Sequence, residues 1–436
     1  MHNNPYPHHH LHRGIMKKTI AILLVAVLAV SSVFAGFTLS GEANVKFKGD
    51  FDAKTLGFIN GQNQVKVTIE GATAEKVNEG DIYAGVKATL AFKALTNKAT
   101  NPASDKDNAV DKVVFEVDKL EVSEAYITDG NWKVSILSAA KTPTFAKGWE
   151  TVKKGNDKKD VVLYAAVGKD VPGVTVEYAG WKVGAGLNVN FNQGQAKNGM
   201  LTIATPAFAF DAVTVKAGAG AANTTGKLTI GGGAEAKYAT DAFTASVAGD
   251  VVYGKVGNTF DAAVRGSVAY APVTVDAFYA TKTDLKDEVV TYVDRAYEGK
   301  DVKENYLSAK VACDLNGFDV PVTITAVGLD LVKDQYFDVE AKATVSGVNG
   351  TVFGGYQISN KTYHVGVAAD YTLEKVGKIY GQFDLSGDSA LKAAKVKVGV
   401  ENTTLVSGAT LKLEYAGVDF VAKKAGAVTA SAQIKF

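Results

Sequence analysis

Residues 243–270 read FTASVAGDVVYGKVGNTFDAAVRGSVAY, and this stretch carries the pattern that decides the fold. Within it, apolar residues and glycines occupy every second position in two runs that begin at Phe243 and Phe260. Side chains of an extended strand point alternately to opposite faces, so each run predicts a strand with one apolar and one polar face. The two apolar faces consist of Phe243, Ala245, Val247, Gly249, Val251 and Tyr253, and of Phe260, Ala262, Val264, Gly266, Val268 and Tyr270.

The same alternation recurs along the rest of the chain, with further runs beginning at Phe37, Ile82, Trp181, Phe337 and Tyr363. Many runs span about 9–11 residues, the length that a tilted strand needs to cross a bilayer. About twenty such segments can be recognised, and no helix of the length found in soluble domains is expected after residue 36. The pattern therefore predicts an all-β protein with many half-apolar strands.

The connections between these segments are of two kinds. Short ones with turn-forming residues include Asp129-Gly130-Asn131, Ala271-Pro272, Val348-Asn349-Gly350 and Ala416-Gly417. Longer polar ones lie at about 95–111, 141–160, 281–304 and 386–391. Short turns at one side and longer loops at the other are typical of a transmembrane antiparallel up-and-down β-barrel, and we expect about 16–24 strands.

From Met16 the chain reads MKKTIAILLVAVLAVSSVFAG, which has the three parts of a secretory signal peptide. Two lysines precede an apolar run of eleven residues, and small residues precede a cleavage point between Ala35 and Gly36. The run is shorter than the ~20 residues that a membrane-spanning helix needs. We therefore predict an upstream extension at 1–15, a Sec-type signal peptide at 16–35 and a barrel domain at 36–436.

Composition excludes several classes of site. The chain has 436 residues, one cysteine (Cys313) and six histidines, and five of those histidines lie in the first twelve residues. Disulfide frameworks and multi-cysteine zinc sites are therefore excluded, and a catalytic triad would have to use His364. The 47 basic and 46 acidic residues are balanced, which argues against a nucleic-acid partner. We predict no enzyme activity, no catalytic or metal-binding residues and no cofactor.

The last ten residues read AVTASAQIKF and end on an aromatic residue. This segment resembles the assembly signal of bacterial outer-membrane β-barrel proteins, which the insertion machinery reads. The resemblance implies an outer-membrane location with membrane lipid and that machinery as partners. The residues that carry it are Val428, Ala430, Ala432, Ile434 and Phe436.

Two further resemblances concern the rest of the chain. Residues 124–137 (EAYITDGNWKVSIL) are similar to an early hairpin of porins, although Ser138-Ala139-Ala140 stands where general porins often have a Gly-Arg pair. Residues 37–51 (FTLSGEANVKFKGDF) resemble spirochaete (treponemal) major outer sheath or surface proteins, which act as porins and host-contact antigens. That family has been described with an N-terminal periplasmic part, so this division stays open as an alternative.

These observations predict an outer-membrane porin that passes small hydrophilic solutes, because barrels of 16 or more strands leave an aqueous channel. A surface-antigen role with host molecules as partners, and homo-oligomerisation, are further expectations. The alternative is an adhesin or a structural surface-layer β protein without a channel.

Residues 141–160 form the best candidate for a pore loop that favours anions. Its candidate charges are Lys141, Lys147, Lys153, Lys154, Lys158 and Lys159. Residues 281–304, with a net charge of −2, are expected to be surface exposed.

Overall fold

The structure is a computed structural model in which most of the chain after residue 35 is described. The described residues are 36–59, 63–72, 80–96, 113–137, 139–152, 158–162, 172–190, 195–224, 226–254, 257–283, 290–292, 295–297 and 304–436. The predicted extension and signal peptide, including Ala35, lie outside these ranges, and Gly36 is the first residue of the first strand. Among the described residues, no helix is long and apolar enough to cross a membrane.

Strands make up nearly all of the described chain. The first half contains β1 (Gly36–Asp50), β2 (Thr55–Phe58), β3 (Gln64–Ala72), β4 (Tyr83–Thr96), β5 (Val113–Thr128), β6 (Trp132–Ser135), β7 (Lys147–Val152), β8 (Lys158–Val162), β9 (Gly173–Tyr178), β10 (Trp181–Asn190), β11 (Gln195–Ala204), β12 (Phe208–Phe210), β13 (Val213–Thr224) and β14 (Lys227–Ala239). The second half contains β15 (Phe243–Gly254), β16 (Thr259–Tyr270), β17 (Val273–Lys282), β18 (Val290–Tyr292), β19 (Arg295–Tyr297), β20 (Glu304–Asp314), the 3₁₀ turn η1 (Leu315–Phe318), β21 (Val322–Leu329), β22 (Tyr336–Val345), β23 (Val348–Gln357), β24 (Thr362–Leu373), β25 (Gly377–Gly387), β26 (Leu391–Asn402), β27 (Ala409–Asp419) and β28 (Lys424–Lys435).

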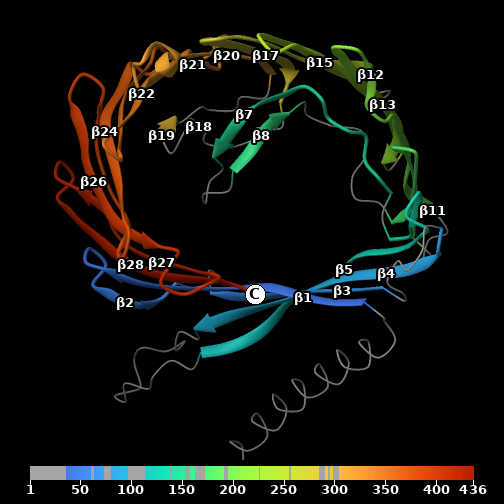
Figure 1. The fold of residues 1–436 in the computed structure, drawn as a ribbon, viewed down its shortest axis with the longest axis horizontal. Coiled ribbons are helices and arrows are strands. Elements are labelled where there is room, and N and C mark those ends of the chain that lie inside the picture. The colour runs from blue at the N-terminus through green and yellow to red at the C-terminus, as the bar shows by residue number, and fades with distance from the viewer. Residues whose placement is uncertain are drawn as a thin grey trace, which may run out of the picture.

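The main sheet closes on itself, since β1 pairs with β28 as well as with β3 (Figure 1). It has 24 strand segments, of which β2 and β12 continue β3 and β11 along the same sides of β1 and β13. Within the described residues, 22 antiparallel strands therefore run around the ring, each paired with the next strand of the ring along the chain. The predicted all-β, up-and-down transmembrane barrel of 16–24 strands is confirmed.

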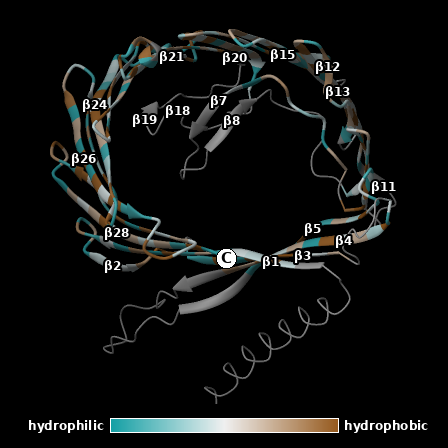
Figure 2. Ribbon diagram, viewed as in Figure 1, coloured by the Kyte–Doolittle hydropathy of each residue, from teal (hydrophilic) through white to brown (hydrophobic). Residues whose placement is uncertain are grey.

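The two faces of the wall differ in chemistry. Residues directly opposite each other on paired strands point to the same face, and the pairs Val247–Gly266 and Val268–Val275 carry the apolar face from β15 to β17. This face is highly exposed: Val247 retains 56% of its accessible surface and Val339 retains 52%. Figure 2 shows hydrophobic and hydrophilic residues alternating along the strands. A continuous exposed apolar face around a closed ring is the surface that hydrocarbon, and not water, covers.

In the antiparallel meander, successive connections lie alternately at the two rims of the barrel. Residues 97–112, 136–172 and 283–303 join strand ends at one rim, whereas Gly36, Phe436 and the short turns 129–131, 179–180 and 271–272 lie at the other. At the short turn after β5, the Asp129 carboxylate accepts the N–H groups of Asn131 and Trp132 at 2.8 and 3.0 Å. The hydrogen bond from Trp132 holds the pKa of this exposed carboxyl below its usual value. By the length rule for bacterial barrels, the rim with the long connections faces the cell exterior.

Two predicted turns and one predicted long loop are wrong in detail. The turn between β22 and β23 lies at Ser346-Gly347, and residues 348–350 already belong to β23. Gly417 lies inside β27, at a shift in the pairing of β27 with β26, and has a positive φ angle of 80°. Gly426, at the facing position of β28, has a φ angle of 77°. Glycine adopts such angles in bulges as easily as in turns. The connection at 386–391 shortens to residues 388–390, because β25 and β26 extend into it.

Aromatic residues mark both rims of the apolar face on β15 and β16. Facing pairs such as Phe243–Tyr270 and Tyr253–Phe260 lie at opposite ends of β15 and β16. The rings of Trp181 and Phe208 contact edge to face, with centroids 6.1 Å apart. Amphipathic rings are favoured at the level of the lipid head groups, so these two girdles fix the height of the barrel in a membrane.

Candidate functional site

Residues 139–147 follow β6 and lie against the inner side of the wall instead of leaving the barrel (Figure 1). The Ala140 N–H donates to the Thr175 hydroxyl on β9 at 2.7 Å, and the Thr202 hydroxyl on β11 donates to the Ala140 carbonyl at 2.5 Å. We call residues 139–147 the inward segment. Because Thr175 and Thr202 belong to the polar faces of their strands, these bonds also show that the polar faces line the interior.

One buried carboxylate holds the far end of the inward segment. Asp250 on β15 accepts the N–H groups of Phe145 at 3.0 Å and of Ala146 at 2.7 Å. Its neighbour Arg265 on β16 donates to the Lys147 carbonyl at 3.3 Å and pairs with Asp276 on β17 at 3.2 Å. Only 6% of the surface of Asp250 is exposed, so the bonds that it accepts are shielded from competing water. Backbone N–H groups donating to an ionised carboxylate form strong hydrogen bonds.

A row of glycines on the polar faces of the strands makes room for the inward segment. A Cβ atom on Gly184 would lie 2.6 Å from the Ala140 nitrogen, and one on Gly218 would lie 2.6 Å from the Pro143 ring. A Cβ atom on Gly220 would lie 2.6 Å from the Thr142 hydroxyl. Neighbouring strands carry lysine, glutamate or threonine at such positions. The three glycines therefore form a track without side chains, in which the backbone of the inward segment can approach the backbone of the wall.

Apolar side chains inside the barrel pack behind the inward segment. Ala139 and Ala146 belong to one buried cluster, against which the Phe145 ring packs. The cluster continues along the inner wall through Met200, Ala222, Ala248, Val252, Ala263, Phe278, Ala280, Tyr306, Val327, Leu329 and Tyr336. A water-filled lumen alone would not bury these residues, so this half of the barrel has a small packed core of its own.

The backbones of two hairpins lie inside the ring. The β7–β8 hairpin, which follows the inward segment, contacts β16 and β17 on the wall and also contacts β18. The β18–β19 hairpin belongs to residues 281–304, and its backbone lies beside β7 inside the ring (Figure 1). The surface exposure of this connection stays a prediction. Both long connections therefore reach toward the same half of the lumen, the half bounded by β9 to β22.

The structure describes some of the predicted site residues but not all of them. Lys141 lies in the inward segment, Lys147 begins β7, and the backbones of Lys158 and Lys159 belong to β8. Lys153 and Lys154 lie outside the described residues. Four residues of the C-terminal signal lie on the apolar face of β28, and the fifth, Phe436, directly follows this strand. The carbonyl of Phe436 accepts the Gly41 N–H of the first strand at 2.7 Å. The roles of these residues in selectivity and in insertion stay predictions.

His364 faces the interior, in keeping with its polar parity on β24. Its Nε2 atom lies 2.8 Å from the Asp338 carboxylate, and its ring stacks on Tyr336 with centroids 5.8 Å apart. In the described part of the chain, no group of three or more His, Cys, Asp or Glu side chains is placed to hold a metal ion.

Sequence reasoning missed the residues that fasten the inward segment, namely Thr175, Thr202, Asp250, Arg265 and Asp276. A lone aspartate on the polar face of a strand has the same pattern as any lumen residue, and its partners are backbone groups about 105 positions away. The glycines of the track carry a usable signal. Gly184, Gly218 and Gly220 occupy polar positions of strands, where a missing side chain indicates a close approach of another part of the chain.

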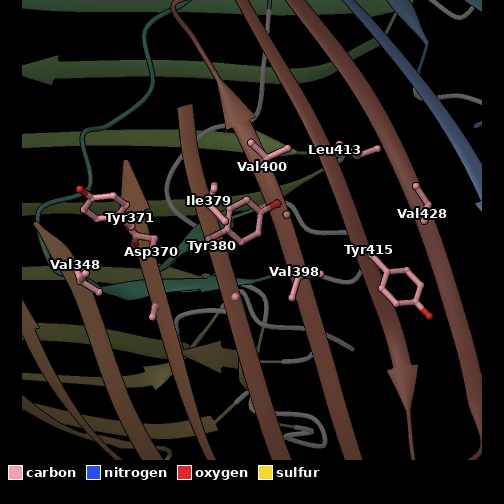
Figure 3. A pocket seen from close by; sticks show the side chains of 13 residues that line it. Val348, Asp370, Tyr371, Ile379, Tyr380, Val398, Val400, Leu413, Tyr415 and Val428 are labelled. Atoms are coloured by element: carbon pink, nitrogen blue, oxygen red, sulfur yellow. The ribbon is translucent and has the colours of Figure 1, made fainter. Parts of the chain in front are cut away.

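One hollow of the barrel wall lies on its outer face (Figure 3). It is a groove of about 650 Å³ across β23 to β28, and its sides include Ile379, Val398, Leu413 and Val428. Gly381 deepens it because that position of β25 has no side chain. All four side chains belong to the apolar face, so the groove is part of the surface that lipid covers and is not a solute site.

Comparison with known proteins finds structural likeness without sequence likeness. No protein-family model and no curated protein match the chain. Among solved structures it is similar to OccK9 (OpdG) of Pseudomonas aeruginosa, at 11% identity and a TM-score of 0.40, covering 93% of this chain and 100% of that one. It is also similar to the outer-membrane protein OpdK of Pseudomonas aeruginosa (11%, 0.38, 92% and 98%) and to the translocation pore of the P pilus usher PapC (10%, 0.38, 92% and 99%). Such distant superpositions do not indicate what this chain transports.

Proposed function

We propose that this protein is an outer-membrane porin that lets small hydrophilic solutes diffuse through a partly narrowed channel. The observation that carries the proposal is the closed ring of 22 strands with an apolar outer face and a charged inner face. A ring of this size encloses more space than wall side chains can fill, so a water-filled lumen is expected. The fastened inward segment and the two hairpins occupy one half of that lumen and would set the size limit for solutes.

Planar-bilayer recording of the purified protein tests this proposal. We expect stepwise conductance increments, together with a β-rich species that depends on detergent and migrates differently after heating. A protein that is extracted by salt alone and forms no conducting steps would favour the alternative of a channel-free adhesin or surface-layer protein. The surface-antigen role, Sec-dependent export, homo-oligomerisation and the treponemal likeness stay predictions from the sequence.

We expect the lysines near the narrowing to bias the channel toward anions. Residues 141–160 carry six lysines against three acidic residues, and their described part lies inside the ring. Lys141→Gln with Lys147→Gln should reduce the anion preference, which the reversal potential in a salt gradient measures. Lys361→Gln, in the exposed turn after β23, is the matched control. An unchanged reversal potential in the double variant would show that these charges do not face the permeating ions.

A further inference from the structure

A row of alternating charges crosses the inner wall close to the rim with the short turns. Its members are Glu70, Lys87, Glu124, Lys133, Glu177 and Lys182, one on each of β3, β4, β5, β6, β9 and β10. Lys87 lies 3.4 Å from Glu70, and Lys182 lies 2.9 Å from Glu177. Lys133 pairs with Glu124. We call this row the charge ladder.

The backbone register joins these three ion pairs into one row. Lys87 is directly opposite Glu124 across β4 and β5, and Lys133 is directly opposite Glu177 across β6 and β9. Adjacent strands lie about 4.8 Å apart, so each charge has an opposite charge on both sides except at the ends. The charge ladder is thus neutral as a whole while it offers both signs at every step.

The charge ladder faces the lumen and remains in contact with water. Glu177 shares a face with Thr175, and Lys182 shares one with Gly184, and both of those residues contact the inward segment. The side chains of its three ion pairs retain between 31% and 45% of their accessible surface. Ion pairs that are exposed to this extent are weak and exchange readily, because water screens them.

A solute with one charge gains little from such a row. To pair with one member it must displace a neighbour, and the displaced side chain then has no partner on that side. A solute that carries an ammonium and a carboxylate can replace both partners at once, so no ladder charge loses its partner. The charge ladder therefore distinguishes solutes by the presence of both signs and not by net charge.

We propose that the charge ladder makes this barrel favour small zwitterions, such as amino acids and short peptides, over uncharged solutes of similar size. The inference rests on the proposed channel function and names the class of solute that the channel passes best. It is separate from the lysines of the inward segment, because the charge ladder has no net charge.

Proteoliposome swelling with glutamine and with xylitol, an uncharged solute of similar mass, tests the inference. The wild-type protein should pass glutamine about threefold faster, the size of effect that weak exposed ion pairs produce. The double variant Glu124→Gln with Lys133→Gln should bring the two rates together without changing the xylitol rate. Because Lys133 also lies over the Tyr126 ring at 4.3 Å, Glu177→Gln with Lys182→Gln provides an independent second variant.

The matched control is Glu374→Gln with Lys375→Gln, which removes an exposed pair of opposite charges from the turn after β24. It should keep the wild-type ratio of rates. Equal wild-type rates for the two solutes, or a preference for glutamine that survives in both ladder variants, would overturn the inference and leave the channel intact. Absence of swelling with either solute in every variant would instead reject the proposed channel.

Discussion

Replacing Asp250 with alanine is expected to release the inward segment from the wall and to raise the single-channel conductance. Asp250 accepts the N–H groups of Phe145 and Ala146, and hydrogen bonds to a charged group contribute about 1.5–3 kcal/mol each. The variant therefore removes most of the directed attachment at the far end of the inward segment, while the Ala140 bonds hold the near end. The barrel itself should persist, because the β15 ladder bonds involve backbone groups only.

Two additional variants decide whether the position of the inward segment is the cause. Gly218→Leu would place a side chain where the Pro143 ring now lies, so it should displace the same segment by a different route and also raise the conductance. Asp241→Asn, in the exposed turn before β15, removes a carboxylate outside the lumen and should leave the conductance unchanged. A folded Asp250→Ala barrel with wild-type conductance would mean that the inward segment does not limit the pore.

Alternation with a period of two was sufficient to predict this fold. In each run, such as 243–253, the alternation shows which residues share a face of the strand. So many strands with one apolar face predict a closed barrel in lipid, because only closure satisfies every backbone hydrogen bond there. Turn positions were less predictable, because glycine occurs both in turns and in bulges within strands. Gly417 and Gly347 both have positive φ, yet one belongs to a bulge inside β27 and the other to a turn. The local sequence does not distinguish these uses, because both require the same backbone angles.

The site was harder to predict than the fold, because its contacts are distant in sequence. The net charge of residues 141–160 drew attention to this connection, but the residues that fasten its first part to the wall come from β9, β11, β15 and β16. Which strand faces the inward segment depends on the curvature of the closed ring, which no single strand encodes. The sequence identifies each residue of the charge ladder as a polar-face residue of its strand. That these residues lie side by side follows only from the register between the strands.

Placing valine at Gly41 is expected to prevent closure of the barrel. β1 and β28 pair from Glu42–Lys435 to Asp50–Ala427, and beyond Glu42 the Gly41 and Phe436 backbones exchange two hydrogen bonds. A Cβ atom at Gly41 would lie 2.4 Å from the Lys66 carbonyl and 2.7 Å from the Phe436 ring. An open seam would expose two strand edges to lipid, where each unsatisfied backbone group costs several kcal/mol. Gly41→Val should therefore abolish the heat-modifiable, membrane-inserted form.

Gly266→Val is the matched control, since Gly266 also lies on the apolar face of a barrel strand and a Cβ atom there meets nothing within 4 Å. Phe436→Ala then separates closure from recognition by the insertion machinery. If the ring mainly covers Gly41, the variant should fold poorly both in cells and in detergent; if it is mainly a recognition signal, refolding in detergent should be normal. The exposed Phe420, in the turn before β28, provides the control substitution Phe420→Ala. A Gly41→Val protein that inserts like the wild type would show that the seam tolerates a side chain and that closure does not depend on this contact.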